Sequence, residues 1–313
     1  MNARKRLEER VAEEFDRPVS PGAHALTVAA RERHPDAVAV LFYGSCLRGA
    51  DDYEGVLDLY VLVDRYEQTY DRRVLVWLNR VLPPNVFYLE TTAPEGTVRA
   101  MFAVVELASF VDFMDDSRRE SYFWGRFSQP VALVWATDSG VRDQLARGCA
   151  TAVATFVRNA LALVPVEFSV EDLWVAGLSR SYNTELRSEG PDRSAALFAT
   201  FADYYWDVTQ PALELLPFDA EVVAPERYRV VVPPAERRMR QAAWRRRGVT
   251  SKLLSLLRIL RNGYTVDGGP EYVMWKIERH TDFRFDKTWR DQPIPLLALA
   301  REAWRAWRAG AFR

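Results

Sequence analysis

Five short runs of mostly β-branched, aromatic and aliphatic residues lie in the first 137 residues, and they constrain the fold more than any other feature. They cover residues 37–43, 56–64, 85–92, 98–107 and 131–137. Runs of this length between turn-forming residues are typical of strands, and the first, which is wholly apolar, is typical of a buried strand. Helical spacing precedes them, at 5–15 and 22–33. The pattern predicts an α/β fold built on one sheet.

The pattern changes after Asp138, where helical spacing takes over. Helices are predicted at 139–164, 192–215, 235–246, 250–262 and 295–312. A proline-bounded segment at 225–234 is either a short edge strand or a linker. Because 313 residues are many for one core, we expect three parts. They are a sheet domain at 1–138, a mostly helical domain at 139–290 and a C-terminal amphipathic helix at 291–313.

Charge and cysteine content narrow the class of protein. The net charge is −1, so the whole molecule is not expected to be attracted to nucleic acid or to anionic lipid. Two cysteines, Cys46 and Cys149, give neither a disulfide framework nor a zinc pattern, which fits a reducing compartment. The N-terminal stretch lacks the apolar core of a signal peptide, and no apolar run reaches the length of a membrane span. We expect a protein of a bacterial cytoplasm.

A Gly-Ser turn follows the first predicted strand, at Gly44 and Ser45. Phosphates bind at such turns because glycine lets the backbone approach and free N–H groups favour negative charge, and Ser45 adds a hydroxyl donor. Asp58, on the next predicted strand, is a carboxylate that can hold a metal ion bridging a triphosphate. The sequence therefore indicates a nucleotide site with Asp58 as its catalytic and metal-binding residue. The alternative is that Gly44 and Ser45 form only a turn.

Nucleotidyl transferases carry a second carboxylate two positions after the first, and here that position holds Tyr60. Asp64 cannot replace it, because it lies about 20 Å along the strand from Asp58. A second metal ligand must come from elsewhere. The candidates on other strands and in the loop are Glu90, Glu106, Asp51, Asp52 and Glu54.

Several motifs occur in an order that resembles one enzyme family. They are Tyr-Gly-Ser at 43–45, the single acid Asp58 with Val-Asp at 63–64, SYFWGRFSQPV at 121–131, FSVEDLWVAGLSRSYNTELR at 168–187, and TSK ending at Lys252. Together they resemble the mitochondrial phosphatidate cytidylyltransferases of the translocator assembly and maintenance family, across roughly residues 38–255. Cys46 stands where that family has a small glycine, and Asn79 is all that corresponds to an Asn and His-Tyr-Ser stretch.

The resemblance implies a nucleotidyltransferase fold, CTP and phosphatidate or another lipid phosphate as substrates, and Mg²⁺ as cofactor. It implies the following roles: nucleotide binding by Tyr43, Gly44, Ser45 and Arg126, and acceptor-phosphate binding by Arg187 and Lys252. The three basic residues are otherwise expected in salt bridges or on the surface. A phosphate acceptor is already anionic and needs no base to deprotonate it, which suits a site with one acid. The alternatives are a nucleotidyltransferase with a soluble acceptor (sugar phosphate, antibiotic, RNA or protein) and a non-catalytic nucleotide-binding module.

Two basic helical segments bear on partners. At 295–313, Leu, Ala and Trp fall on one side of a helical wheel and Arg301, Arg305, Arg308 and Arg313 on the other. This make-up is typical of a helix that lies in a membrane interface, the alternative being packing on its own domain. The stretch 237–247 is a solvated face, a nucleic-acid contact or a lipid contact. We expect no nucleic-acid partner and a peripheral location on the inner face of the membrane.

Overall fold

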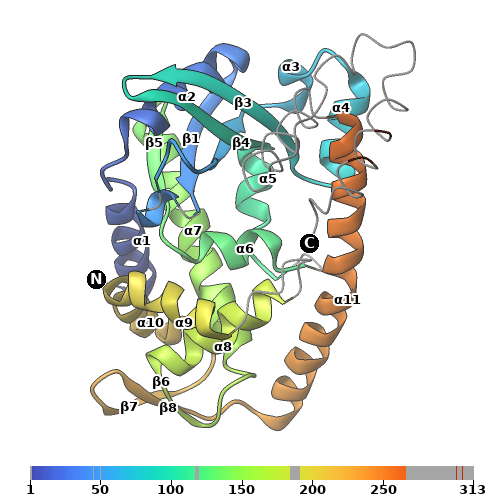
Figure 1. The fold of residues 1–313 in the computed structure, drawn as a ribbon. Helices are drawn as coiled ribbons and strands as arrows, with labels where there is room; N and C mark the ends of the chain where they lie inside the picture. The colour runs from blue at the N-terminus through green and yellow to red at the C-terminus, as the bar shows by residue number, and fades with distance from the viewer. Residues whose placement is uncertain are drawn as a thin grey trace.

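The computed structural model describes residues 2–44, 46–49, 51–116, 120–183 and 191–265, together with Arg301 and Arg305. The protein has a mixed α/β fold, in which a five-stranded sheet is covered by helices on both faces and a smaller sheet lies beyond them (Figure 1). The predicted helix at 295–313 lies outside the described residues apart from its two arginines. Among the described residues, no helix has both the length and the apolar character needed to cross a bilayer.

The five predicted strands are confirmed. They are β1 (Ala37–Tyr43), β2 (Leu57–Val63), β3 (Asn85–Ala93), β4 (Gly96–Glu106) and β5 (Ala132–Ala136). Their order in the sheet is β3-β4-β2-β1-β5, with β2 and β4 parallel and the other neighbours antiparallel. The two central strands, β1 and β2, are buried along almost their whole length, as their apolar sequences predict.

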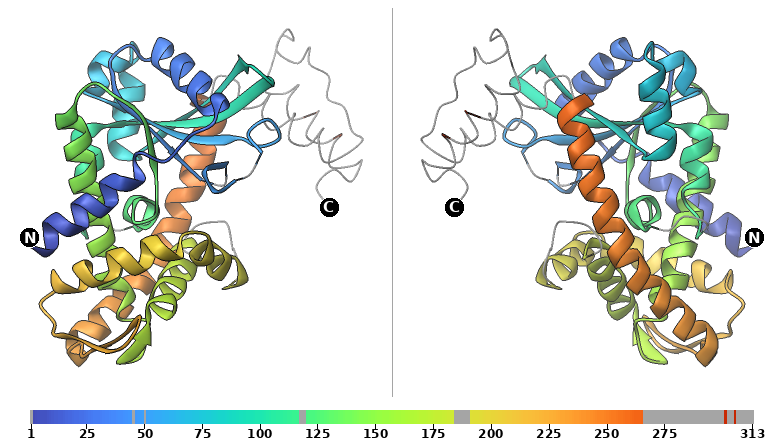
Figure 2. Two further views of the ribbon diagram at one scale, coloured as in Figure 1. Left: turned by 90° about the vertical axis from the view of Figure 1, so that its left-hand side faces the viewer. Right: turned by 90° about the vertical axis from the view of Figure 1, so that its right-hand side faces the viewer.

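Helices cover the two faces of the sheet unequally (Figure 2). One face packs against α2 (Pro21–Arg33), α3 (Tyr66–Thr69) and α4 (Arg73–Val81). The other packs against α1 (Ala3–Glu14), α5 (Leu107–Asp112), α6 (Tyr122–Phe127) and α7 (Ser139–Ala160). Asp58 and Tyr60 share this second face, because side chains alternate along β2. The candidate site is therefore on the side of α6.

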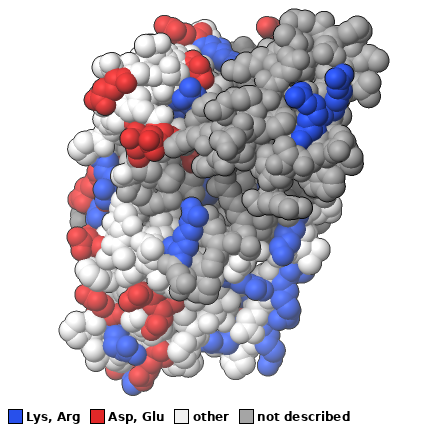
Figure 3. Space-filling model, viewed as in Figure 1, with Lys and Arg blue, Asp and Glu red and all other residues white. Residues whose placement is uncertain are grey.

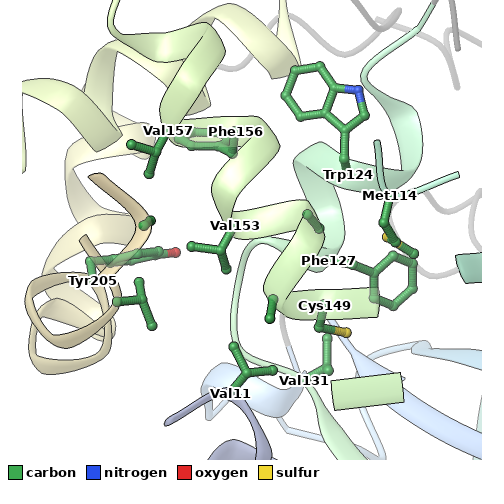
Figure 4. Close-up of a cluster of buried hydrophobic side chains, with 14 of the residues drawn as sticks. Val11, Met114, Trp124, Phe127, Val131, Cys149, Val153, Phe156, Val157 and Tyr205 are labelled. Carbon is green, nitrogen blue, oxygen red and sulfur yellow. The ribbon is translucent and has the colours of Figure 1, made fainter. Parts of the chain in front are cut away.

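The second half is mostly helical and shares a core with the first. After α7 come α8 (Val170–Tyr182), α9 (Pro191–Thr200), α10 (Ala202–Glu214) and α11 (Pro234–Thr265). The expected boundary coincides with the start of α7, where the side chain of Asp138 caps the helix. Hydrophobic packing nevertheless continues across it: Val11 and Val131 of the first half lie in one cluster with Val153 and Tyr205 of the second (Figure 4).

Four features of the second half differ from the sequence prediction. The helix predicted at 192–215 is two helices, α9 and α10, and α8 lies where no helix was predicted. The segment at 225–234 contains β8 (Arg227–Val230), which is the central strand of a small sheet between β6 (Glu167–Ser169) and β7 (Ala220–Ala224), not an edge strand or a linker. Its prolines lie outside the paired residues, so they cost no ladder hydrogen bond. The two helices predicted at 235–246 and 250–262 are one helix, α11, which continues through Gly248.

A buried polar cluster holds α11 against α7. Arg240 and Arg247 of α11 both bond the carboxylate of Asp116 and the side chain of Asn159, and Trp244 donates to the Asn159 carbonyl at 3.0 Å. Burial would raise the pKa of Asp116, but the charge of Arg247 and hydrogen bonds from Asn159 and Arg240 outweigh it and lower the pKa. These interactions fix which side of α11 is buried, and this offsets the helix-weakening effect of Gly248.

His34 is a buried ring without a hydrogen-bond partner among the described residues. It packs against the rings of Tyr70, Phe87 and Phe102, with centroid distances of 5.5–6.4 Å, and neither ring nitrogen is bonded. Burial, assisted by the charge of Arg33, lowers its pKa to about 4. The imidazole is therefore neutral in the folded protein near pH 7, and His34 is a packing residue of the core.

We expect His34 to make the fold sensitive to acid. In the unfolded chain the His34 imidazole binds a proton below its ordinary pKa of 6.5. In the folded protein it does so only below about pH 4. The stabilising contribution of the neutral ring should therefore fall by about 3 kcal/mol as pH drops through this window. His34→Phe should remove that loss, as measured by urea unfolding at pH 7, 5.5 and 4. His24→Gln, at an exposed position, should follow the wild-type curve; if His34→Phe also does so, the buried ring is not the cause.

Candidate functional site

Gly44 and Asp58 meet at the paired ends of β1 and β2. Tyr43, the last residue of β1, is directly opposite Asp58 in the register. Gly44 follows with φ of +101°, and a Cβ added there would overlap Oδ2 of Asp58. Glycine is thus required for two separate reasons, a left-handed backbone and close approach to a carboxylate. Ser45 lies outside the described residues, so its predicted hydroxyl contact stays a prediction.

Tyr60, where a second acid would be expected, is an aromatic packing residue. It is 4% exposed, and its ring lies 4.8 Å from that of Phe127 and 6.4 Å from those of Phe123 and Tyr43. Burial raises its pKa well above the ordinary value, and its hydroxyl bonds that of Tyr122. A carboxylate here would be buried among rings, which is costly without a partner. The surroundings of residue 60 therefore suit an aromatic ring and not a second acid.

Arg126 stands beside these tyrosines on α6. It donates to the Tyr122 carbonyl at 2.9 Å, and its guanidinium carbon lies 3.7 Å from the centre of the Tyr122 ring. Burial raises the pKa of Tyr43 and of Tyr60, and the positive charge of Arg126 acts against that rise at both. Tyr43, Gly44, Asp58 and Arg126 therefore lie close together in the structure. All four are residues that the sequence analysis assigned to a nucleotide site.

Hydrogen bonds that link Tyr43, Tyr182 and Gln129 were not predicted from the sequence. Tyr182 of α8 bonds the hydroxyl of Tyr43 and lies 3.2 Å from Oε1 of Gln129. Gln129 in turn donates to the Gly125 carbonyl at 2.9 Å. A Cβ on Gly125 would overlap Oγ of Ser181, so glycine allows α6 and α8 to touch. The motif at 121–131 therefore packs against the described part of the second motif, at 168–183.

Arg258 of α11 reaches the edge of the same cluster. It donates to both carboxylate oxygens of Glu120, at 2.8 and 2.6 Å, and to the Pro83 carbonyl at 2.9 Å. Its guanidinium carbon lies 4.4 Å from the centre of the Tyr122 ring, which Arg126 also approaches. The signal for Arg258 in the sequence was a cation within the mostly apolar run at 253–260, and it was not singled out there.

The predicted acceptor-phosphate residues are not brought to the site by the described part of the chain. Arg187 lies outside the described residues. Lys252 is exposed on α11, six residues or about 9 Å before Arg258 along the helix. Asn79, which the resemblance matched to an Asn and His-Tyr-Ser stretch, is buried and structural: it bonds the Tyr70 hydroxyl, the Val104 carbonyl and the Asn85 amide.

Most of the carboxylates proposed as second metal ligands have other contacts. Glu106 accepts from the Tyr66 amide at the far end of the strand, about 17 Å from the row of Asp58. Asp52 accepts from the Ser20 hydroxyl, and Asp51 caps its own loop through the Tyr53 and Glu54 amides. Glu90 bonds Arg99.

Magnesium fits this site only as an ion shared with phosphate. No group of three His, Cys, Asp or Glu side chains suited to a metal occurs within the described residues. Mg²⁺ often binds through one or two carboxylates together with substrate phosphates and water. The single carboxylate of Asp58 therefore suits an ion that arrives with a triphosphate better than a resident one.

Two comparisons with known proteins found no relative of this chain. A scan against models of protein families found no match for this chain, and a search of curated proteins found none. The resemblance to the phosphatidate cytidylyltransferases rests on the motifs alone. The nucleotidyltransferase fold, substrates and residue roles that it implies are therefore carried forward as proposals.

A matched pair of variants can distinguish the energetic effect of the contact between Gly44 and Asp58 from that of backbone strain. Gly44→Ala and Gly49→Ala each place a side chain at positive φ, +101° and +93°, but a Cβ at Gly49 has no atom within 4 Å. Gly49→Ala should cost about 1–2 kcal/mol of unfolding free energy from the backbone alone.

Gly44→Ala should cost clearly more, because Asp58 or the turn must also move. Urea unfolding of both variants, followed by far-UV circular dichroism, measures the difference. Equal losses in the two variants would show that the close approach to Asp58 contributes nothing.

Proposed function

We propose that this protein is a nucleotidyltransferase that transfers CMP from CTP to phosphatidate, giving CDP-diacylglycerol and pyrophosphate. One observation carries the proposal: a glycine turn at the end of β1 is pressed against the carboxylate of Asp58 on the neighbouring strand. Such a turn suits a triphosphate, whose charge the carboxylate-bound cation and Arg126 offset. The choice of cytosine as the nucleotide base and of phosphatidate as the acceptor rests on the motif resemblance.

The residues present suit an acceptor that is already ionised. An acceptor phosphate oxygen attacks the α-phosphorus of CTP, the bond from that phosphorus to its bridging oxygen breaks, and pyrophosphate leaves. Mg²⁺, when bound, neutralises charge on the triphosphate, and Asp58 would hold it. Tyr60 cannot act as a base, because burial keeps its hydroxyl protonated. A phosphate monoester loses its second proton near pH 6, so no base is needed.

A lipid acceptor also requires the protein to stay at a membrane surface. The Trp, Leu and Arg pattern at 295–313 supports this, since such a helix lies flat in the interface. We place the protein in the bacterial cytoplasm, peripheral on the inner face of the membrane. A soluble acceptor would need no such anchor.

The test is turnover by a pair of variants on one strand. Wild-type protein with Mg²⁺, labelled CTP and phosphatidate vesicles should form labelled CDP-lipid. Asp58→Asn should lower this rate by roughly 100-fold or more, because it removes the charge that holds the cation at the phosphates. Asp64→Asn changes an acid that is 67% exposed at the end of the same strand, and it should keep wild-type turnover.

Each other outcome rejects part of the proposal. Full activity in folded Asp58→Asn removes the site assignment. Turnover with another nucleotide removes the base preference. Turnover only with a sugar phosphate, antibiotic, RNA or protein identifies a soluble-acceptor enzyme, and nucleotide binding without turnover identifies a non-catalytic module.

A further inference from the structure

The solvent side of α11 combines cations with large apolar side chains. The exposed cations are Arg238, Arg245, Arg246 and Lys252. The apolar side chains are Met239, Val249, Leu253 and Leu257, which are 53%, 72%, 58% and 42% exposed. At 100° per residue all eight fall within an arc of about 140°. We call this set the α11 face.

The charge of the α11 face is not neutralised by its own helix. The single acid of α11, Glu236, bonds Arg240 and Arg158. Among the described residues, none of the four exposed cations forms an ion pair. The opposite side of the helix is fixed by Arg240, Trp244 and Arg247. The α11 face is therefore held outward by buried contacts.

A cavity borders the first half of the α11 face and extends toward the buried side of the helix, where Arg240 and Arg247 line it. This cavity of about 820 Å³ is also lined by Met239, Arg245, Arg246 and Val249. Asp116 also lines it, but both of its oxygens are bonded to arginines. Lys and Arg side chains form a band over this region, along the lower right edge of the molecule in Figure 3. The cavity presents positive charge beside exposed aliphatic surface.

The chemistry of the α11 face distinguishes among partners. Its apolar members are aliphatic, so they give no stacking platform for nucleic-acid bases. A second copy would bring a face of the same charge, and the segment at 295–313 is itself basic. Cations alternating with aliphatic side chains on one helix side match a bilayer interface, where headgroup phosphates meet acyl chains.

We propose that the α11 face docks the protein on an anionic lipid bilayer, with lipid phosphates taken by the cations and the four apolar side chains entering the interface. This surface belongs to a different stretch of the sequence from 295–313, and the proposal does not depend on nucleotide transfer. Arg258, which reaches the edge of the candidate nucleotide site, is on the opposite, buried side of the same helix.

The experiment compares charge reversals at two places in the full chain, without nucleotide. Binding is measured by sedimentation with vesicles of equal parts phosphatidylglycerol and phosphatidylcholine. Arg245→Glu with Arg246→Glu should weaken binding by roughly 30-fold or more, since each cation near the surface counts. Arg4→Glu with Lys5→Glu makes the same charge change on α1 and should alter binding less than about twofold. Circular dichroism and urea unfolding check that each variant folds.

A third variant tests the apolar part of the α11 face. Leu253→Ser with Leu257→Ser should weaken binding yet keep its salt dependence, because apolar burial is not screened. Equal losses in the two charge-reversal variants would mean that net charge alone matters and would overturn the proposal. Wild-type binding by Arg245→Glu with Arg246→Glu would also overturn it, as would a wild-type protein that ignores vesicles and binds single-stranded RNA. Failure here with intact CDP-lipid synthesis would leave the proposed function standing.

Discussion

The carboxylate of Asp116, shared between Arg240 and Arg247, determines how the longest helix is set on the molecule. Two buried guanidinium groups facing one acid and Asn159 admit few arrangements, because a cation left without its partner in this interior is costly. The orientation has two consequences on opposite sides of α11. Arg258 is carried to Glu120 and to the ring of Tyr122, and the exposed cations and aliphatic side chains are turned to solvent.

In the candidate site, aromatic packing limits where a charged side chain can lie. One face of β2 carries Asp58 at its open end and Tyr60 two residues deeper, where Phe123 and Phe127 surround it. The carboxylate of Asp58 lies at the end of the strand, beside the glycine turn. A charged group is tolerated there because it is only partly buried. The ring at Tyr60 leaves one acid, Asp58, on this part of the β2 face, and in the proposed function phosphate oxygens of the substrate would complete the ligands of a cation.

The sequence predicted the parts of the structure that depend on local pattern. The five strands were found because each is a short apolar run, and the meeting of Gly44 with Asp58 was found because a turn ends one strand beside the next. The bond of Tyr182 to Tyr43 and the reach of Arg258 could not be found, because they depend on which helices pack together. For the same reason α11 was divided at Gly248, although buried contacts on both sides of that glycine keep the helix continuous.

Net charge was the least informative property of this sequence. The chain as a whole is nearly neutral, at −1, yet α11 contains nine basic residues and one acid. Screening explains why the local value matters: at ordinary salt, charges more than about 10 Å away contribute little to the potential at a surface. The acids that balance α11 overall bond arginines elsewhere, such as Glu167 with Arg229 and Glu14 with Arg10. The proposed docking on an anionic surface therefore depends on the local charge of α11 and not on the total charge of the protein.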